Sequence, residues 1–287
     1  MPDLISENLR EDLLQVFEDP RYAPPMLPSV ALEVLALTTR PEPDVNRIVS
    51  LLERDQMMAL YVLRLAGSAL YAGRARITTL REAVVRLGAY VVRDAVFEVA
   101  LRKGMLSRGE YGRTVATIAR HGTLTAYITR IVCRHARIGD NLAFLCGLLH
   151  DIGFTALLIA VEHVEGPGAP KVAALWPHVD ALHERASLLL ARRWMLPDEI
   201  VEIVGYHHHL HTSAMRPVAA AVQIADHLSA YVGGSVLGPG PTGETLPGDV
   251  VGEFDLEANA AALRLDEAAL ARIREEAERT VPEIALL

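Results

Sequence analysis

The sequence is poor in cysteine and in long apolar runs. Only two cysteines occur, Cys133 and Cys146, 13 positions apart. This spacing fits neither a zinc ribbon nor a disulfide framework, so both are predicted to be reduced core residues. No window reaches the roughly 18 uninterrupted apolar residues of a membrane span. Residues 1–7 also lack the basic and apolar stretches of a secretion signal. We therefore expect a cytoplasmic protein with no membrane segment.

Surplus positive charge is also missing. The chain of 287 residues has a net charge of −8, whereas proteins that bind a phosphate backbone usually carry a basic excess. Nucleic acid is therefore not expected as the main partner. Hydrophobic residues make up 51% of the chain, which is enough for a substantial core and predicts two lobes.

Alternating β-branched runs bounded by tight turns are absent, and apolar residues instead recur at spacings of three and four. The predicted fold is therefore all-α and two-lobed. An N-terminal helical lobe is expected over 1–105, with helices at 4–18, 29–39, 44–54, 56–67, 79–87 and 89–104. A second, HD-like helical lobe is expected over 106–232, with helices at 111–137, 141–150, 152–164, 177–193, 198–209 and 216–232. The remainder, 233–287, reads as a Gly/Pro-rich loop followed by one or two helices at 258–280 that pack on the second lobe.

Helix caps support three of these starts. Asp44 and Asp140 are predicted N-caps, and Thr79 with Glu82 has the spacing of a capping box.

The most informative pair is His150-Asp151, an imidazole and a carboxylate inside the apolar run Leu148-Leu149-His150-Asp151-Ile152-Gly153. Unpaired polar groups are costly in apolar surroundings, so neighbouring residues must supply partners. A divalent metal ion would satisfy several such groups at once.

Four further positions place a polar residue where helical spacing predicts an apolar one. His121 lies on a stripe with Ile118 and Ile128, and His183, His207 and Asp226 occupy similar faces. His208 is either a further ligand beside His207 or a surface neighbour. We expect one shared site in preference to separately satisfied core histidines, formed by His121, His150, Asp151, His183, His207, His208 and Asp226. The remaining histidines in these stretches, His178, His209, His211 and His227, are expected at the surface or at helix ends.

Imidazole and carboxylate ligands suit one or two divalent ions of Fe, Mn, Zn, Ni or Co, and the ligand set does not choose among them. One aspartate could bridge two ions. Two ions roughly 3.5–4 Å apart could polarise a phosphoryl oxygen and generate hydroxide from water.

The order of motifs resembles the HDOD family, the HD-related output domains of bacterial signalling proteins, over about residues 25–230. The segments that carry this resemblance are Leu27-Pro28, LERD at 52–55, LRLAGSALY at 63–71, ITTLREAVVRLG at 77–88, GLLHDIG at 147–153, WMLP at 194–197 and YHH at 206–208. Two positions depart from the family pattern, Gln56 in place of the usual Pro and Gly67 in place of the usual Asn.

The resemblance implies a relationship to HD phosphohydrolases, including the HD-GYP cyclic-di-GMP phosphodiesterases, although many HDOD members are regulatory binding modules. It aligns His121, His150-Asp151, His183, His207-His208 and Asp226 with the metal ligands of HD proteins. Phe154, however, stands where HD-GYP enzymes have a phosphate-binding lysine. The Gly-Tyr-Pro segment is also missing, and Arg185, Arg192 and Arg193 are the candidate substitute cations.

Two functions follow from this resemblance. The first is a bacterial cytoplasmic signalling module that binds a protein partner or a nucleotide-type ligand, with homodimerisation as an option, and that retains an HD-type metal site. The alternative is a metal-dependent phosphohydrolase acting on a nucleotide or cyclic dinucleotide, with Asp151 and a metal-bound hydroxide as the catalytic groups.

Overall fold

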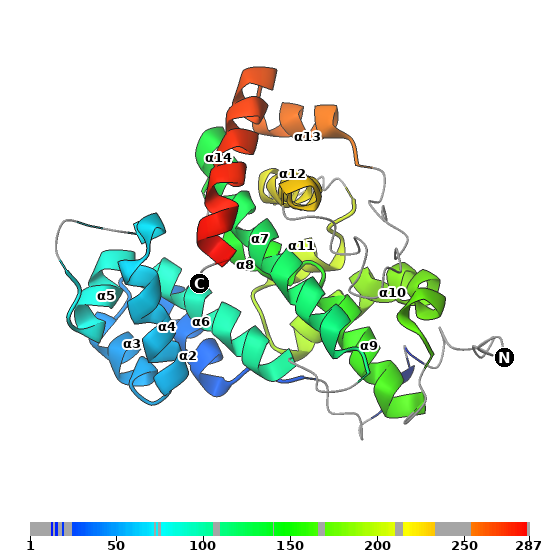
Figure 1. Ribbon diagram of the computed structural model, residues 1–287, viewed down its shortest axis with the longest axis horizontal. Helices are drawn as coiled ribbons and strands as arrows, with labels where there is room; N and C mark the ends of the chain where they lie inside the picture. The colour runs from blue at the N-terminus through cyan, green and yellow to red at the C-terminus, as the bar shows by residue number, and fades with distance from the viewer. Residues whose placement is uncertain are drawn as a thin grey trace. The chain divides into compact units, whose positions relative to one another are not determined.

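Every secondary-structure element in the described part of the chain is helical, which confirms the predicted all-α class. The computed structural model describes residues 13, 15, 16, 19, 25–71, 73, 76–105, 110–139, 141–165, 170–209, 215–232 and 254–285. The chain divides into a smaller unit, Leu27–Gly104 with Glu278–Leu287, and a larger unit, Met1–Met26 with Met105–Ala277 (Figure 1). The three-part division at residues 105 and 232 stays a prediction.

Side-chain caps mark the starts of three short helices in the smaller unit. Asp44 accepts the backbone N–H of Arg47 at 3.0 Å, and Thr79 and Glu82 form the predicted capping box. Such caps satisfy backbone N–H groups that a helix start leaves unpaired. The helices are α2 (Ser29–Thr38), α3 (Val45–Leu52), α4 (Gln56–Gly67), the 3₁₀ turn η1 (Ala69–Tyr71), α5 (Leu80–Leu87) and α6 (Ala89–Met105). Their bounds agree with the predicted segments to within two residues.

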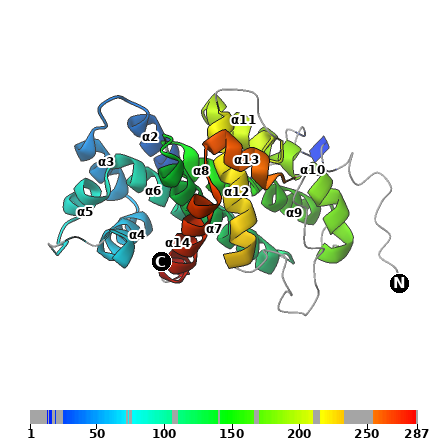
Figure 2. The same cartoon turned by 90° about the horizontal axis from the view of Figure 1, so that it is seen from above.

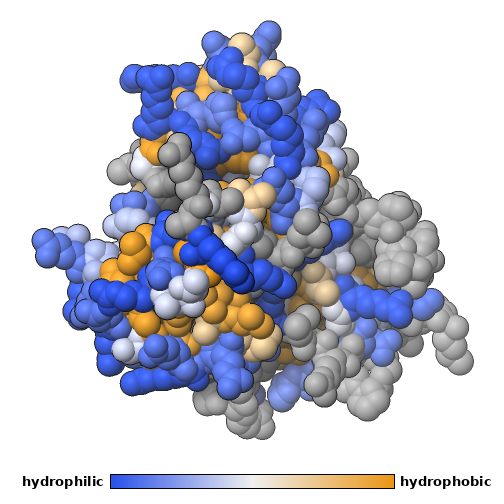
Figure 3. Space-filling model, turned by 60° about the vertical axis from the view of Figure 1, so that its left-hand side comes forward, coloured by the Kyte–Doolittle hydropathy of each residue, from blue (hydrophilic) through white to orange (hydrophobic). Residues whose placement is uncertain are grey.

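Large apolar side chains remain exposed on the smaller unit. Met57 and Leu60, one turn apart on α4, are 59% and 60% exposed, and Val85 on α5 is 64% exposed. Apolar surface bounded by hydrophilic side chains is visible on the face drawn in Figure 3. The opposite sides of these helices supply the core, through Ala31, Val34, Ile48, Leu51, Met58, Val62, Leu65 and Val84.

The larger unit contains longer helices. They are α7 (Gly112–Ala136), α8 (Ala143–Leu149), α9 (Ile152–Glu165), α10 (Val172–Arg193), α11 (Asp198–Gly205), α12 (Arg216–Val232), α13 (Leu256–Leu263) and α14 (Glu267–Ala285), the last of which ends in the residues grouped with the smaller unit. Helix α7 packs against α8, α9 and α12, while α10 packs against α9 and α11. Helix α13 lies on α12 (Figure 2).

Three helix ends differ from the sequence prediction by more than two residues. Helix α14 continues to Ala285, beyond the predicted end at 280. Helix α10 begins at Val172 and contains Pro177, whereas the predicted helix began at residue 177. Helix α11 ends at Gly205, because Tyr206 turns away at φ −146° and its N–H bonds to Ile203. The two histidines His207 and His208 therefore lie in a turn and not on a helix. Asp140, the loop at 233–248 and most of the segment 4–18 lie outside the described residues.

One core cluster of the larger unit is formed by α7, α12 and the C-terminal helices, together with Ala143 of α8. Both cysteines are buried and reduced, as predicted. The stretch Ala143–His163 is long and apolar enough to span a membrane, with a mean hydropathy of 2.0, but 89% of its window is buried inside the protein, as in the core helix of a folded domain. Residues of this core include Ile128, Ile131, Val132, Cys133, Ala143, Ala220, Ala221, Ile224, Ala225, Leu263, Ile273 and Ala277.

Two glycines allow helices to approach closely on either side of the His-Asp pair. A Cβ on Gly147 would lie 2.7 Å from the Thr129 hydroxyl, so α8 approaches α7 closely. A Cβ on Gly153 would lie only 1.9 Å from the carbonyl oxygen of His183, so α9 approaches α10 closely. The turn that carries His150 and Asp151 is thereby held between α7 and α10.

Candidate metal centre

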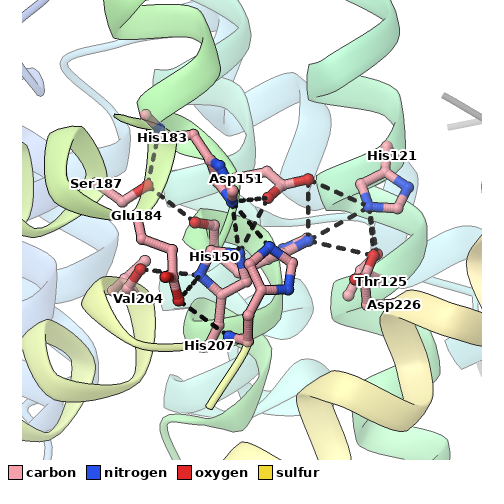
Figure 4. A network of polar contacts seen from close by, with 12 residues as sticks. His121, Thr125, His150, Asp151, His183, Glu184, Ser187, Val204, His207 and Asp226 are labelled. Carbon is pink, nitrogen blue, oxygen red and sulfur yellow. Dashed lines mark hydrogen bonds and ion pairs between the residues drawn. The ribbon is translucent and has the colours of Figure 1, made fainter. Parts of the chain in front are cut away.

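The seven candidate ligands come from distant parts of the chain and lie together in the larger unit. Their donor atoms form two groups, and within each group all of these atoms lie within 4.8 Å of one another. Six of the seven are labelled in Figure 4, where their side chains point toward a common centre: His121, His150, Asp151, His183, His207 and Asp226. Group A contains His121 of α7, His150 and Asp151 of the α8–α9 turn, and Asp226 of α12; group B contains His183 of α10 with His207 and His208 of the turn after α11. The structure thus brings together all seven residues, and their role as metal ligands stays a prediction.

Asp151 faces both groups, with one carboxylate oxygen toward each. Its Oδ2 lies 3.2 Å from His150 Nε2 and 3.6 Å from His121 Nε2 in group A. Its Oδ1 lies 3.3 Å from His207 Nε2 and 3.8 Å from His183 Nε2 in group B. Placed between the two groups, this carboxylate would be able to hold one ion in each of them.

Asp226 supplies the second carboxylate of group A. Its Oδ1 lies 2.8 Å from His121 Nε2 and 3.4 Å from His150 Nε2. Group A therefore offers two carboxylates and two imidazoles. Group B offers three imidazoles and the shared oxygen of Asp151.

Three of the histidines have their tautomer set within their own helical turn. The Nδ1–H groups of His150, His183 and His207 donate to backbone carbonyls three residues earlier, at 2.8, 2.5 and 3.0 Å. A carbonyl oxygen only accepts, so the proton is on Nδ1, and Nε2 of the neutral ring carries a lone pair. All three lone pairs point into the centre.

In group B these lone pairs face one another without a proton to share. His183 Nε2 lies 2.9 Å from His208 Nε2 and 3.2 Å from His207 Nε2. In group A, His121 Nε2 lies 3.3 Å from His150 Nε2. Two acceptors at such distances repel unless a cation lies between them. The donor set therefore fits a metal ion in each group.

His121 obtains its orientation from a different helix. Its Nδ1 lies 3.0 Å from the hydroxyl of Ser229 on α12. That hydroxyl donates its own proton to the Asp226 carbonyl at 2.8 Å and also accepts from Thr125 at 3.2 Å. Ser229 can then only accept from His121, which again places the ring proton on Nδ1 and the lone pair of Nε2 toward Asp226.

The histidines of group B are held neutral. Burial, followed by the proximity of His207, lowers the pKa of His183 to about 4. Burial is also the largest cause that lowers the pKa values of His207 and His208 below the usual 6.5. Neutral imidazole is the form that binds metal.

Group A instead favours positive charge. Burial alone would lower the pKa of His150, but the carboxylates of Asp151 and Asp226 outweigh it and raise this pKa well above 6.5. Burial would raise the pKa values of Asp151 and Asp226, yet the neighbouring imidazoles hold both below 3.8. Group A thus stabilises a positive charge. In the metal-free chain this charge is a proton, and a metal ion that binds to group A would displace the proton.

The position after the His-Asp-Ile-Gly motif is apolar in structure as well as in sequence. Phe154 stacks on the His183 ring at 4.2 Å between centroids and on Trp176 at 4.7 Å. Within the described chain, the other charged partners of the seven residues are the carboxylates of Asp180 and Glu184. The candidate cations Arg185, Arg192 and Arg193 are exposed and make no such contact.

The other histidines are not ligands in this arrangement. His209 is 70% exposed and lies 3.5 Å from Glu184, which agrees with its predicted surface position. His178 is half-buried, and so is His227, which stacks on Phe254 at 4.3 Å; the surface prediction for these two was therefore only partly right. His211 lies outside the described residues.

The sequence analysis missed two residues that support the site. Ser187 accepts the Gly153 N–H and donates to the His150 carbonyl, both at 2.9 Å, and so joins α10 to the His-Asp turn. Gln223 donates to the carbonyls of His207 and His209 at 2.7 and 3.1 Å. Each is a polar residue on the buried face of its helix, the same signal that singled out the histidines.

Fold and site together define an all-helical protein with an HD-type histidine and aspartate centre. The family model of the HDOD domain matches residues 25–210, and the chain belongs to this family. A curated relative, an uncharacterized protein of Treponema pallidum (strain Nichols), is 26% identical over 200 residues, which are 65% of this chain. The chain spans only 38% of the length of that relative.

Solved structures share the fold at low sequence identity. An HDOD domain protein of unknown function from Geobacter sulfurreducens is 21% identical with a TM-score of 0.66, over 98% of this chain and 99% of that one. A protein of Shewanella amazonensis SB2B, provisionally named a metal-dependent phosphohydrolase, is 19% identical with a TM-score of 0.63, over 89% and 98%. A protein of Marinobacter aquaeolei VT8, provisionally named for signal transduction, is 20% identical with a TM-score of 0.65, over 97% and 64%. At these identities the likeness is one of fold.

Proposed function

We propose that this protein is an HDOD-type signalling module whose larger unit binds two divalent metal ions. The observation that carries this proposal is the convergence of imidazole Nε2 atoms, 2.9 to 3.3 Å apart, around a carboxylate that faces both groups. Without cations these acceptors would meet in an almost water-free interior. One ion in each group satisfies all of them, with Asp151 shared.

The ligand types limit the identity of the ions. Imidazole nitrogen and carboxylate oxygen suit Fe, Mn, Zn, Ni and Co, while thiolate is missing from both groups. Group A, with two carboxylates, matches the charge of a divalent ion. Group B, with three imidazoles, is the softer of the two positions.

Two features support a regulatory role. Phe154 occupies the position beside His183 where a cation would be needed to neutralise a bound phosphate. The smaller unit exposes Met57, Leu60 and Val85, and exposed apolar surface of this kind is typical of binding sites for other proteins. We therefore propose a protein partner or a nucleotide-type ligand as the signal that this module receives or passes on.

Elemental analysis of the purified full-length chain tests the metal proposal. We expect two equivalents of a transition metal per chain, and loss of both in Asp151→Ala, because this side chain serves both groups. Asp198→Ala removes an exposed carboxylate at the start of α11 and should keep both equivalents. A wild-type chain that binds no metal even after reconstitution with Fe, Mn, Zn, Ni and Co would refute the proposal.

A second candidate function is metal-dependent hydrolysis of a phosphoester, which the position of Asp151 between the two groups favours. Bound ions would supply a polarised phosphoryl oxygen and an activated water, and Asp151 would hold the two positions together. Incubation with a general phosphodiester and with cyclic dinucleotides separates the candidates. Turnover that disappears in Asp151→Ala and persists in Asp198→Ala would establish the hydrolase, whereas two bound ions without turnover would favour the regulatory module.

A further inference from the structure

The turn at residues 206–209 carries two of the three imidazoles of group B. The His209 N–H closes the turn on the Tyr206 carbonyl at 3.0 Å, and side chains of neighbouring helices supply further hydrogen bonds. The turn follows the end of α11, so no helical hydrogen bonds fix His207 and His208 beyond the bond of His207 Nδ1 to Val204. The His208 N–H donates to Glu184 of α10 at 3.0 Å. The carbonyl groups of the turn are bound from α12.

Gln223 of α12 binds the carbonyls of His207 and His209 with a single amide group. Its Nε2 donates to the His207 carbonyl at 2.7 Å and to the His209 carbonyl at 3.1 Å. The side chain is buried, and both partners only accept, so the amide orientation is fixed with its nitrogen toward the turn. The oxygen of Gln223 must then point away from the turn.

Asn259 of α13 donates a hydrogen bond to that oxygen. Its Nδ2 donates to Gln223 Oε1 and to the Asp255 carbonyl, both at 2.9 Å. Asn259 is fully buried, and its own Oδ1 has no hydrogen-bond partner among the described residues. A buried polar atom left unpaired is destabilising. An apolar residue at position 259 would therefore pack more favourably than asparagine, unless the hydrogen bonds of Asn259 Nδ2 offset this cost. That donor is what connects α13 to the turn.

We propose that α13 controls metal binding in group B through the amide pair Asn259–Gln223. This inference rests on the proposed metal function and adds its regulation. When α13 packs on α12, Asn259 orients Gln223, and Gln223 holds the double-histidine turn in its ligating position. A protein partner that draws α13 away from α12 would release the turn and weaken group B without contact to any ligand. Both amides lie outside residues 25–210 that match the family, so this control is a property of the C-terminal part of this chain.

Metal titration of shape-preserving variants tests the control. In Gln223→Met and Asn259→Leu we expect the affinity of group B to fall about 10–100-fold, the usual effect of losing an outer-shell partner. The affinity of group A should stay as in the wild type. Ser229→Ala provides the reciprocal control, since Ser229 contacts His121 of group A and should weaken that group alone. Equal losses in both groups for Asn259→Leu, or no loss in either, would overturn the proposal.

A measurement on the metal-free chain separates this proposal from the metal function. Amide hydrogen exchange at His208 and His209 should accelerate in Asn259→Leu, because the turn then loses its clamp, while exchange in the middle of α7 stays unchanged. Unchanged exchange at the turn would overturn the control by α13 even if the wild-type chain binds two ions. A wild-type chain that binds no metal would instead refute the proposed function and, with it, any control of metal affinity.

Discussion

Among single residues, Ser229 is the one on which His121 depends. It accepts the Nδ1–H of His121 and donates to the Asp226 carbonyl, so it joins two ligands of group A. We expect Ser229→Ala to weaken metal binding in group A by about 10–100-fold, because the ring can then adopt the other tautomer. Competition titration with a chromophoric chelator measures this loss.

The control is a hydroxyl with the same local bond but no ligand nearby. Thr38 in the smaller unit is buried and donates to the Leu35 carbonyl at 2.9 Å, three residues earlier, as Ser229 does to Asp226. Thr38→Val should lower the melting temperature slightly and leave both metal affinities unchanged. If Ser229→Ala behaves like Thr38→Val, the assigned role of Ser229 is wrong.

The buried histidines predict a stability maximum for the metal-free chain near pH 6.5. Below this value the unfolded chain takes up a proton at His183 that the folded chain accepts only near pH 4, so stability falls as the pH drops from 6.5 toward 4. Above pH 6.5 the folded chain keeps a proton on His150 that the unfolded chain releases, so stability falls as the pH rises.

Thermal unfolding in the presence of chelator, from pH 4.5 to 8.5, measures this profile. His183→Gln should flatten the acid side and His150→Gln the alkaline side. Bound metal should shift the maximum to higher pH, because it replaces the proton on His150. A melting temperature that does not change with pH in the chelated wild type would contradict the assigned protonation states.

Helical spacing singled out His121, His183, His207 and Asp226, because each is polar where an apolar residue is expected. The pair His150-Asp151 was identified because it interrupts an apolar run, and neither pattern needs tertiary information. The sequence could not identify the bond from Gln223 to the turn. That bond depends on where α11 ends, and the end is set by the non-helical backbone of Tyr206, at φ −146° and ψ 32°. The sequence also left His208 open between a metal ligand and a surface neighbour. Its Nε2 lies 2.9 Å from the Nε2 of His183, which favours the ligand.

Among elements, the contact between α9 and α10 depends on Gly153. A methyl group there would lie 1.9 Å from the His183 carbonyl and 2.7 Å from the Ser187 nitrogen, both of them backbone atoms of α10. We expect Gly153→Ala to destabilise the fold by at least about 1–3 kcal/mol, since the two helices must separate. The same movement would pull His183 away from Asp151 and reduce metal binding in group B. Denaturant unfolding and metal titration measure the two effects.

Gly67, at the end of α4, provides the matched control. A Cβ there has no atom within 4 Å, and alanine favours the helix over glycine by roughly 0.5–1 kcal/mol. Gly67→Ala should therefore be neutral or stabilising and should leave both metal groups intact. Equal unfolding midpoints for the two variants would show that α9 and α10 have room to move apart.

Helix boundaries show where sequence patterns are insufficient. Apolar periodicity placed α4 and α12 at their observed bounds, and glycine marks the C-terminal end of both, Gly67 as the last residue of α4 and Gly233 directly after α12. The start of α10 was predicted five residues too late, since Val172–Trp176 precede Pro177 in the helix. Tertiary packing of the buried Leu175 and Trp176 outweighs the preference of proline for a first turn.

For the whole molecule, metal should contribute directly to stability. A ligand that binds only the folded chain stabilises it by about 2.7 kcal/mol at a free concentration 100 times its Kd. For a chain of this size we expect chelation to lower the melting temperature by about 5–10 °C for each site emptied. Asp151→Ala should melt at the same temperature with and without chelator. An unchanged wild-type melting curve, with loss of metal verified by elemental analysis, would contradict the proposal.

Three of the candidate ligands are oriented by a hydrogen bond from the ring Nδ1–H to the backbone carbonyl three residues earlier. Such a bond forms as soon as the local turn forms, on the microsecond timescale of helix formation. His150, His183 and His207 are therefore ready as ligands before distant parts of the chain have met. Assembly of the centre then requires only that preformed segments meet. Ion binding during biosynthesis would wait for α12, which carries Asp226, the last candidate ligand along the chain.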